Sequence, residues 1–257
     1  MKRKYFFFDI DGTLLTAQYS QIVCPESTQE ALKQLKENGH FIAIATGRSQ
    51  ARAEEVRKML GIENMVSDGG NGITLNNQLI EIEPLDYDCC LALIDECKEK
   101  NFIWALSFDN SPIRYAPDER FYAATHDTYM ETKIIENLDP RNYSTIYKVY
   151  IACLDQEEKA LESLNALPWC RFHNEYLFVE PCDKAKGIKK VIEMINGNIE
   201  DVVVFGDQKN DLSMFIDEWT SIAMGNAVDE LKDKADYITD DVDKDGIWKA
   251  CKHFGWI

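Results

Sequence analysis

"YFFFDIDGTLLT" (residues 5–16) places four large aromatic side chains in a row and follows them with two carboxylates two positions apart. A short run this apolar is typical of a strand that is buried on both faces of a sheet. Asp9 and Asp11 then stand where the buried strand leaves the sheet, and Gly12 permits a sharp exit of the chain. The stretch therefore predicts a central strand whose end carries acidic side chains.

Two further stretches, "FIAIATG" (residues 41–47) and "VVVFGD" (residues 202–207), also end a short apolar run on small or polar residues. Residues 27–39 and 186–198 instead place apolar side chains three and four positions apart, which is typical of helices that pack on a sheet. Strands that alternate with helices predict an α/β fold with a doubly wound, parallel, Rossmann-like sheet. Such sheets bind ligands at the carboxyl ends of their strands.

The middle of the chain follows a different pattern. Its strand-like stretches alternate apolar with polar residues, which is typical of an antiparallel sheet with one open face. We expect strands within 102–108, 143–153 and 170–181, and helices near 88–100 and 156–166. Residues 83–182 are therefore predicted to form a smaller α+β domain, inserted into a core made of residues 1–82 and 183–257.

Composition restricts the class of partner. The chain has 28 Lys and Arg against 45 Asp and Glu, a formal net charge of −17, which disfavours nucleic acids and anionic membranes. No apolar run approaches the roughly 20 residues of a membrane span. The eight cysteines show neither paired nor zinc-binding spacing and are expected to be reduced thiols. We expect a cytoplasmic protein with a small-molecule ligand, and the sequence leaves its oligomeric state open.

Four motifs carry candidate chemistry. "DIDGT" (residues 9–13) and "GDQKND" (residues 206–211) supply the hard oxygen ligands that Mg²⁺ prefers. "TGR" (residues 46–48) offers a hydroxyl and backbone N–H groups to phosphate oxygens. Lys186 opens a predicted helix, where its charge adds to the helix dipole, and Lys184 competes with it for this role.

The charges of these motifs indicate a bound cation. Asp9, Asp207 and Asp211 around a phosphate dianion would repel one another by roughly 1–4 kcal/mol per pair. A divalent cation, together with Lys186 on the phosphate, reverses that field and lets a carboxylate attack phosphorus. Asp11 is the nearest group that can protonate the leaving alkoxide and later deprotonate water.

The four motifs resemble those of the haloacid dehalogenase superfamily of phosphohydrolases. "SDGGNGI" (residues 67–73) and "AMGNA" (residues 223–227) further resemble its Cof-type branch, whose members are Mg²⁺-dependent phosphatases of small phosphate esters, mostly sugar phosphates. The resemblance makes Asp9 the nucleophile and Asp11 the acid/base. It implies that phosphate is bound by Thr13, Thr46, Gly47, Lys186 and Asn210, and metal by Asp9, Asp11, Asp207 and Asp211. The Asp11 contribution to the metal is its backbone carbonyl.

The same resemblance makes the inserted domain a cap that closes over the site, because the insertion lies between the second and third motifs. Four polar or aromatic cap residues are specificity candidates: Arg114, Tyr115, His173 and Tyr176. Two alternatives stay open. One is a phosphosugar mutase of the phosphomannomutase type, and the other is a phosphometabolite-binding protein without catalysis.

Overall fold

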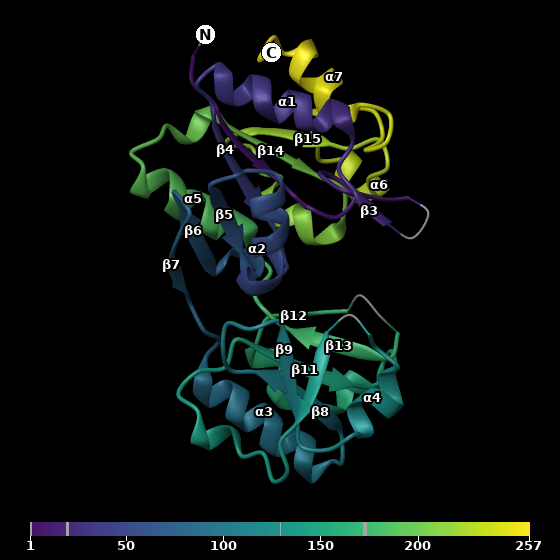
Figure 1. Cartoon of the computed structure of the whole chain (residues 1–257). Helices are drawn as coiled ribbons and strands as arrows, with labels where there is room; N and C mark the ends of the chain where they lie inside the picture. Colours follow the sequence, from purple (N-terminus) through teal and green to yellow (C-terminus); the bar gives the residue numbers. More distant parts are fainter. Residues whose placement is uncertain (1, 19–20, 129, 172–173) are drawn as a thin grey trace. The chain divides into compact units, whose positions relative to one another are not determined.

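The computed structural model describes residues 2–18, 21–128, 130–171 and 174–257 (Figure 1). The chain divides into two compact units. Unit 1 comprises Met1–Arg48, Ala53–Glu81 and Asp183–Ile257, and unit 2 comprises Ser49–Arg52 and Ile82–Cys182. Among the helices in these described ranges, none is both long and apolar enough to cross a membrane.

Unit 1 is built on an eight-stranded sheet in the order β16-β15-β14-β1-β4-β5-β6-β7. Its strands are β1 (Tyr5–Phe8), β4 (Phe41–Ala45), β5 (Asn64–Ser67), β6 (Gly72–Leu75), β7 (Gln78–Ile82), β14 (Val202–Gly206), β15 (Thr220–Ala223) and β16 (Tyr237–Ile238). The strands from β16 to β5 pair in parallel, and β6 pairs antiparallel with β5. The three apolar stretches of the sequence are thus the central strands β1, β4 and β14, side by side.

Helices cover both faces of this sheet (Figure 1). They are α1 (Glu26–Glu37), α2 (Gln50–Met59), α5 (Lys184–Met194), α6 (Asp229–Lys232) and α7 (Gly246–His253). Phe6 and Phe8 face the core formed with α1, α2 and α7, while Phe7 faces the core formed with α5 and α6. Alternate residues of β1 are therefore buried on opposite faces, which explains its unbroken apolar run. The predicted doubly wound α/β fold is confirmed.

Short elements complete unit 1. They are the hairpin β2 (Thr16–Gln18) and β3 (Gln21–Val23) and the 3₁₀ turns η1 (Asp68–Gly70), η5 (Ile199–Asp201) and η6 (Lys209–Met214). Phe8 lies opposite Phe205 of β14 and Ile44 of β4. The carboxyl ends of these three strands therefore meet at one edge of the sheet, and the motifs follow directly from them.

Unit 2 holds a six-stranded sheet in the order β10-β9-β8-β11-β13-β12. Its elements are α3 (Tyr87–Glu99), β8 (Ile103–Ser107), β9 (Ile113–Ala116), α4 (Arg120–Thr125), β10 (Glu131–Ile134), η2 (Pro140–Asn142), β11 (Lys148–Ala152), η3 (Glu157–Ala160), η4 (Glu162–Ala166), β12 (Trp169–Cys170) and β13 (Tyr176–Val179). Among the residues that the structure describes, the strands of this sheet pair antiparallel, except that β9 and β10 pair in parallel.

The structure corrects one predicted helix in unit 2. Residues 156–166 form the two 3₁₀ turns η3 and η4, separated at Leu161, whose backbone is extended. The carboxylate of Glu96 on α3 accepts hydrogen bonds from the backbone N–H groups of Glu162 and Ser163. This side-chain acceptor takes the place of the carbonyl oxygens that a continuous helix would have supplied.

Candidate active site

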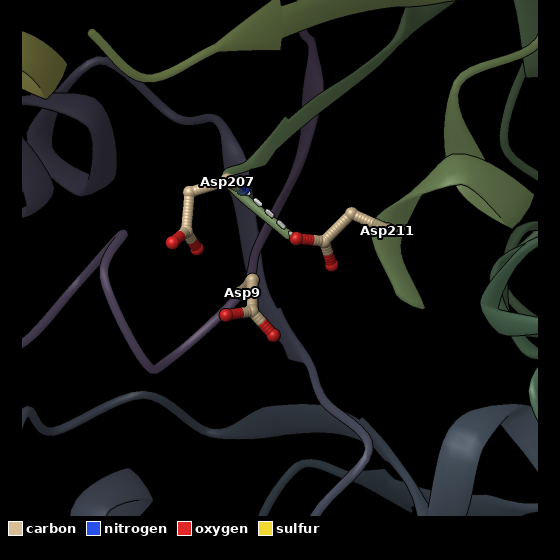
Figure 2. Close-up of side chains that lie close together, drawn as sticks. All are labelled: Asp9, Asp207 and Asp211. Atoms are coloured by element: carbon tan, nitrogen blue, oxygen red, sulfur yellow. Dashed lines mark hydrogen bonds between the residues drawn. The ribbon is translucent and has the colours of Figure 1, made fainter. Parts of the chain in front are cut away.

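Three buried carboxylates form the centre of the site at the carboxyl edge of the unit 1 sheet (Figure 2). Asp9 directly follows β1, Asp207 directly follows β14, and Asp211 lies in η6. Each side chain offers an oxygen within 4.8 Å of the others. The backbone fixes this arrangement, because Asp9 N–H donates to the carbonyl of Phe205 over 3.0 Å.

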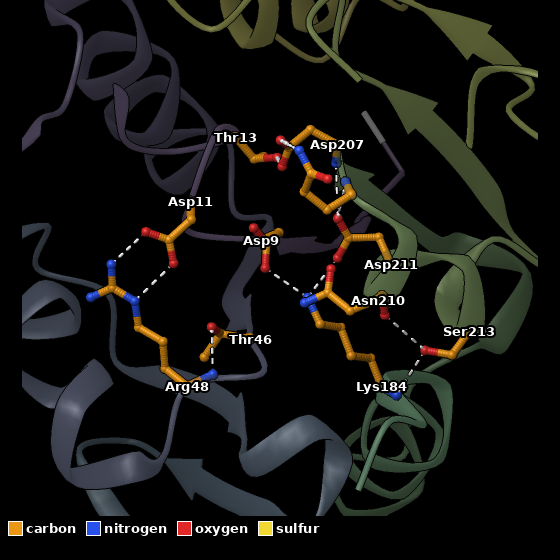
Figure 3. A network of polar contacts seen from close by, with 11 residues as sticks. Asp9, Asp11, Thr13, Thr46, Arg48, Lys184, Asp207, Asn210, Asp211 and Ser213 are labelled. Carbon is orange, nitrogen blue, oxygen red and sulfur yellow. Dashed lines mark hydrogen bonds and ion pairs between the residues drawn. The ribbon is translucent and has the colours of Figure 1, made fainter. Parts of the chain in front are cut away.

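Lys184 is the cation that balances part of this charge (Figure 3). Its Nζ lies 2.6 Å from Asp9 Oδ1 and 2.5 Å from Asp211 Oδ1, and the side chain is only 1% exposed. The other oxygen of Asp211 accepts the backbone N–H groups of Asp207 and Gln208, each at 2.9 Å. Asp211 thus uses both oxygens to hold Lys184 and the loop that carries Asp207.

One ammonium against three carboxylates leaves the cluster short of positive charge. Burial raises the pKa of Asp9 most, and Asp211 and Asp207 raise it further against the lowering effect of Lys184, to about 8. Burial and the Asp211 carboxylate raise the pKa of Asp207 to about 7. Burial opposes the charge of Lys184, but Asp211 and Asp9 outweigh it and raise the pKa of the ammonium. Without another cation, the excess negative charge therefore favours protonated carboxyl groups.

Gly12 and Thr13 shape the space around Asp207. Gly12 has a positive φ of 84°, and a Cβ atom at this position would lie 2.2 Å from Asp207 Oδ2. Only glycine therefore fits between the loop and the carboxylate. The hydroxyl of Thr13 donates to Asp207 Oδ1 over 3.2 Å, so its side chain orients a carboxylate. The phosphate contact that the resemblance implies for Thr13 stays a prediction.

Three of the residues predicted to bind phosphate, Thr46, Gly47 and Asn210, lie at the same edge. Thr46 follows β4 and is buried, and its Oγ1 accepts the N–H of Arg48 over 3.1 Å. The amide nitrogen of Asn210 would lie 3.4 Å from a Cβ atom added to Gly47, so these two residues are neighbours. The buried Oδ1 of Asn210 has no hydrogen-bond partner among the described residues.

Asp11 differs from the buried carboxylates because its side chain is 60% exposed. It lies on the far side of Asp9 from Lys184 in Figure 3, where both its oxygens accept hydrogen bonds from Arg48. The two aspartates of the motif therefore have distinct environments. Asp9 is buried among charged side chains, whereas Asp11 is accessible to solvent.

The structure corrects the choice between the two lysines. Lys186 is exposed, and its Nζ lies 3.3 Å from Asn71 Oδ1, while Lys184 reaches the carboxylates. Residues two positions apart on a helix point in different directions, so only one lysine can face the sheet. Lys184 precedes Ile188 by four and Val191 by seven positions, and both are buried. That spacing was the available sequence signal, because it places Lys184 on the buried face.

A family model described as haloacid dehalogenase-like hydrolase matches residues 6–251. The chain belongs to this family. The predicted superfamily, its Cof-type branch and the enzyme class, a hydrolase of phosphate esters, are confirmed.

Relatives of this hydrolase match over its whole length. YkrA, a provisionally named phosphatase of Bacillus subtilis (strain 168), is 34% identical, with 100% of both chains covered. YcsE of the same organism, a 5-amino-6-(5-phospho-D-ribitylamino)uracil phosphatase, is 28% identical over 99% of this chain and 96% of its own. Among solved structures, the HAD subclass IIB sugar phosphatase BT4131 superposes with a TM-score of 0.80 at 29% identity, over 99% of this chain and 100% of that one.

Asn226 of the "AMGNA" motif is a residue whose role the sequence did not reveal. Its Nδ2 donates to the Gly12 carbonyl over 2.9 Å, and its Oδ1 accepts the N–H of Val242 over 2.8 Å. The N–H of Gly12 donates to the Leu15 carbonyl over 2.9 Å. Both backbone groups of Gly12 therefore have hydrogen-bond partners, which fixes the loop that follows Asp9 and Asp11.

Two of the four specificity candidates of unit 2 are buried inside that unit, although all four were candidates for contact with substrate. Arg114 and Tyr176 are buried inside unit 2, where the Arg114 guanidinium pairs with Asp127 at 2.6 Å and lies over the Phe121 ring. Tyr115 is half-buried, and its hydroxyl donates to Asp109 over 2.8 Å. Arg114 and Tyr176 thus serve the packing of unit 2, and His173 lies outside the described residues.

Proposed function

We propose that this hydrolase is a Mg²⁺-dependent phosphatase that transfers the phosphoryl group of a small phosphorylated metabolite to Asp9 and then to water. The observation that carries the proposal is the cluster of Asp9, Asp207 and Asp211 with Lys184 as its partner cation. The raised pKa values of Asp9 and Asp207, about 8 and about 7, support a site that takes up further positive charge.

The donor set fits magnesium. Asp9 and Asp207 offer carboxylate oxygens, and the family resemblance adds the backbone carbonyl of Asp11. Mg²⁺ takes one or two carboxylates of this kind and keeps several waters. Gly12 leaves room beside Asp207 that a side chain would fill. Both oxygens of Asp211 are already engaged, so Asp211 supports the metal site through Lys184 and the 207–208 backbone. When bound, Mg²⁺ would neutralise charge on the transferring phosphoryl group.

Side chains of the protein supply the nucleophile, the proton donor and the phosphate-binding groups of the first step. A carboxylate oxygen of Asp9 bonds to phosphorus as the bond from phosphorus to the ester oxygen breaks, and Asp11 gives its proton to the departing oxygen. Lys184 is placed to bind a phosphate oxygen beside Asp9. Thr46 and Gly47 on one loop and Asn210 on another offer hydroxyl and N–H donors, so charge that develops on the phosphoryl oxygens meets fixed dipoles.

The second step returns the enzyme to its starting state. The Asp11 carboxylate takes a proton from water, the water oxygen bonds to phosphorus, and the bond to Asp9 breaks, which releases inorganic phosphate. Asp11 needs access to both leaving group and water, and its exposed side chain is consistent with this role.

The names of two relatives support a substrate class for the proposal. A sugar phosphatase and a phosphatase of a phosphoribityl compound both act on phosphate esters of polyhydroxylated chains. We propose sugar phosphates as the first substrates to test, with residues 83–182 as the cap domain on the core of 1–82 and 183–257. All eight cysteines are free, and five are buried, which supports a reducing, cytoplasmic location.

Two measurements test the proposal: the release of phosphate from esters, and the mass of the intact protein, which reveals covalent phosphate. EDTA should abolish the hydrolysis of p-nitrophenyl phosphate and of sugar phosphates, and Mg²⁺ should restore it. Asp9→Asn should form no covalent phosphate. Asp11→Asn should accumulate phosphate on Asp9 and release about one p-nitrophenolate per site in a burst, because its second step lacks the base.

Asp217→Asn, an exposed carboxylate in unit 1, is the matched control and should behave as the wild type. Full turnover in EDTA would refute the metal dependence. If Asp11→Asn binds substrate but shows neither burst nor adduct, direct attack by water would replace the aspartyl-phosphate route.

A further inference from the structure

Arg48 makes the contact that defines the position of Asp11. Its Nε lies 2.8 Å from Asp11 Oδ2 and its Nη2 lies 2.5 Å from Asp11 Oδ1 (Figure 3). Two parallel N–H···O bonds between a planar guanidinium and a planar carboxylate fix both the distance and the orientation of the carboxylate. Arg48 was not among the residues predicted to act in catalysis or to bind phosphate or metal.

The arginine is the fixed member of this pair. Its side chain is 12% exposed, against 60% for Asp11. Its backbone N–H donates to the Thr46 hydroxyl over 3.1 Å, and its carbonyl accepts the N–H of Asp68 over 2.8 Å. Arg48 is therefore tied to the loop after β4 and to η1, while Asp11 would otherwise be a short exposed side chain free to change rotamer.

The two cations of the site serve different carboxylates. Lys184 forms ion pairs with Asp9 and Asp211, and Arg48 forms an ion pair with Asp11. A lysine offers a point charge, whereas an arginine offers a fork that also sets orientation. Orientation matters for Asp11, because a group that donates a proton must lie within hydrogen-bond reach of the departing oxygen.

We propose that Arg48 is a positioning residue that holds the Asp11 carboxyl group toward the leaving-group oxygen. The inference rests on the proposed phosphatase function and adds a division of labour to it. Arg48 acts through Asp11, whereas Lys184, Thr46 and Asn210 act on the transferring phosphoryl group. Loss of Arg48 should therefore depend on the leaving group.

The experiment compares esters that differ in their need for a proton. Arg48→Ala should lower kcat/KM for phenyl phosphate by about 10- to 100-fold, a part of the typical effect of a general acid. For p-nitrophenyl phosphate, whose leaving group needs little protonation, the loss should be several-fold smaller. Arg48→Lys should recover only part of the activity, since a lysine cannot hold both oxygens at once.

The double variant separates the two possible roles of Arg48. Adding Arg48→Ala to Asp11→Asn should leave the burst rate with p-nitrophenyl phosphate unchanged, because an effect that runs through Asp11 is already lost. Inhibition by inorganic phosphate should be similar in Arg48→Ala and the wild type. Arg141→Ala, which breaks an exposed two-point pair with Asp95 in unit 2, is the matched control and should change neither readout.

Two outcomes would overturn the assignment alone. One is an equal loss on both esters together with weaker inhibition by inorganic phosphate, which would make Arg48 a phosphate ligand. The other is an additive loss in the double variant. A wild-type protein that hydrolyses none of the esters would instead overturn the proposed function, and the assignment of Arg48 with it. Melting temperatures of Arg48→Ala and Arg48→Lys close to that of the wild type ensure that the comparison concerns folded protein.

Discussion

Lys184 and Lys186 lie two positions apart in the chain but differ in burial and in the residues that they contact. Lys184 is buried between Asp9 and Asp211, whereas Lys186 is exposed beside Asn71. Lys184→Ala should lower kcat/KM by about 100-fold or more, because a preorganised charge at the reacting phosphoryl group is lost. Lys186→Ala removes the same group from the same helical turn and should stay within about 3-fold, since exposed charges are screened.

Initial rates with p-nitrophenyl phosphate check this pair, with melting temperatures to confirm folding. Equal losses in the two variants would contradict the placement of Lys184. A loss confined to Lys186→Ala would return the phosphate-binding role to the lysine that the sequence first favoured.

Gly12 offers a second prediction at the scale of one residue. Gly12→Ala adds a methyl group 2.2 Å from Asp207 Oδ2 and also strains a backbone with φ of 84°. Gly39→Ala meets the same strain at φ of 80° but has no neighbour within 4 Å. The control should lose about 1–2 kcal/mol of unfolding free energy. Gly12→Ala should lose more, and its half-saturating Mg²⁺ concentration should rise.

Chemical denaturation and Mg²⁺ titration of activity measure the two quantities. Similar destabilisation of both variants with unchanged Mg²⁺ dependence would show that Asp207 moves aside at no cost. The close approach of Gly12 to Asp207 would then be incidental to the metal site.

At the scale of elements, the start of α5 is docked on η1 by close backbone contact. A Cβ atom at Gly187 would lie 2.6 Å from the Gly70 carbonyl oxygen, and one at Gly70 would lie 2.0 Å from the Asp183 carbonyl oxygen. Gly70 of "SDGGNGI" is thus explained by packing. This contact places the first turn of α5, and therefore Lys184, against the strand ends.

Gly187→Ala should destabilise the protein by about 1–3 kcal/mol, because overpacking here outweighs the better helix propensity of alanine. It should also lower kcat, since Lys184 shares the displaced turn. Lys189→Ala on the exposed face of the same helix should cost less than about 0.5 kcal/mol. Denaturation curves and rates test both, and a stabilised, fully active Gly187→Ala variant would contradict the docking argument.

The elements also show which features a sequence reveals. The strands β1, β4 and β14 were predictable because burial on both faces leaves an unbroken apolar run, and the motifs that follow them had to meet at one edge. The pairing of Arg48 with Asp11 was not predictable from the sequence, because it depends on how two side chains from different loops approach each other. The burial of Arg114 was hidden for a related reason: its partner Asp127 lies on another segment of unit 2.

For the whole molecule, the buried carboxylates couple stability to pH and to metal. The pKa values of Asp9 and Asp207 rise from 3.8 to about 8 and about 7 in the metal-free fold. Between pH 4 and pH 8 the folded protein therefore binds protons that the unfolded chain has released. The stability that these groups contribute is fully present below about pH 4 and is lost as the pH rises toward 8.

Magnesium should reverse this trend, because a bound cation favours the ionised carboxylates and its binding displaces their protons. We expect the rise in melting temperature caused by Mg²⁺ to be larger at pH 8 than at pH 6, by several degrees. In EDTA, Asp207→Asn should lose less stability than the wild type between pH 6 and pH 8, because one raised pKa is gone.

Thermal melts at the two pH values, with and without Mg²⁺, measure these differences. Asp217→Asn serves as the control, since an exposed carboxylate should follow the wild-type curve under every condition. The comparison between variants cancels the titration of groups far from the site, which a single curve would mix with that of the site. A Mg²⁺ effect of equal size at both pH values would mean that the carboxylates are already ionised in the metal-free fold, so that Lys184 alone offsets their repulsion. The charge deficit that favours a second cation at the site would then be absent.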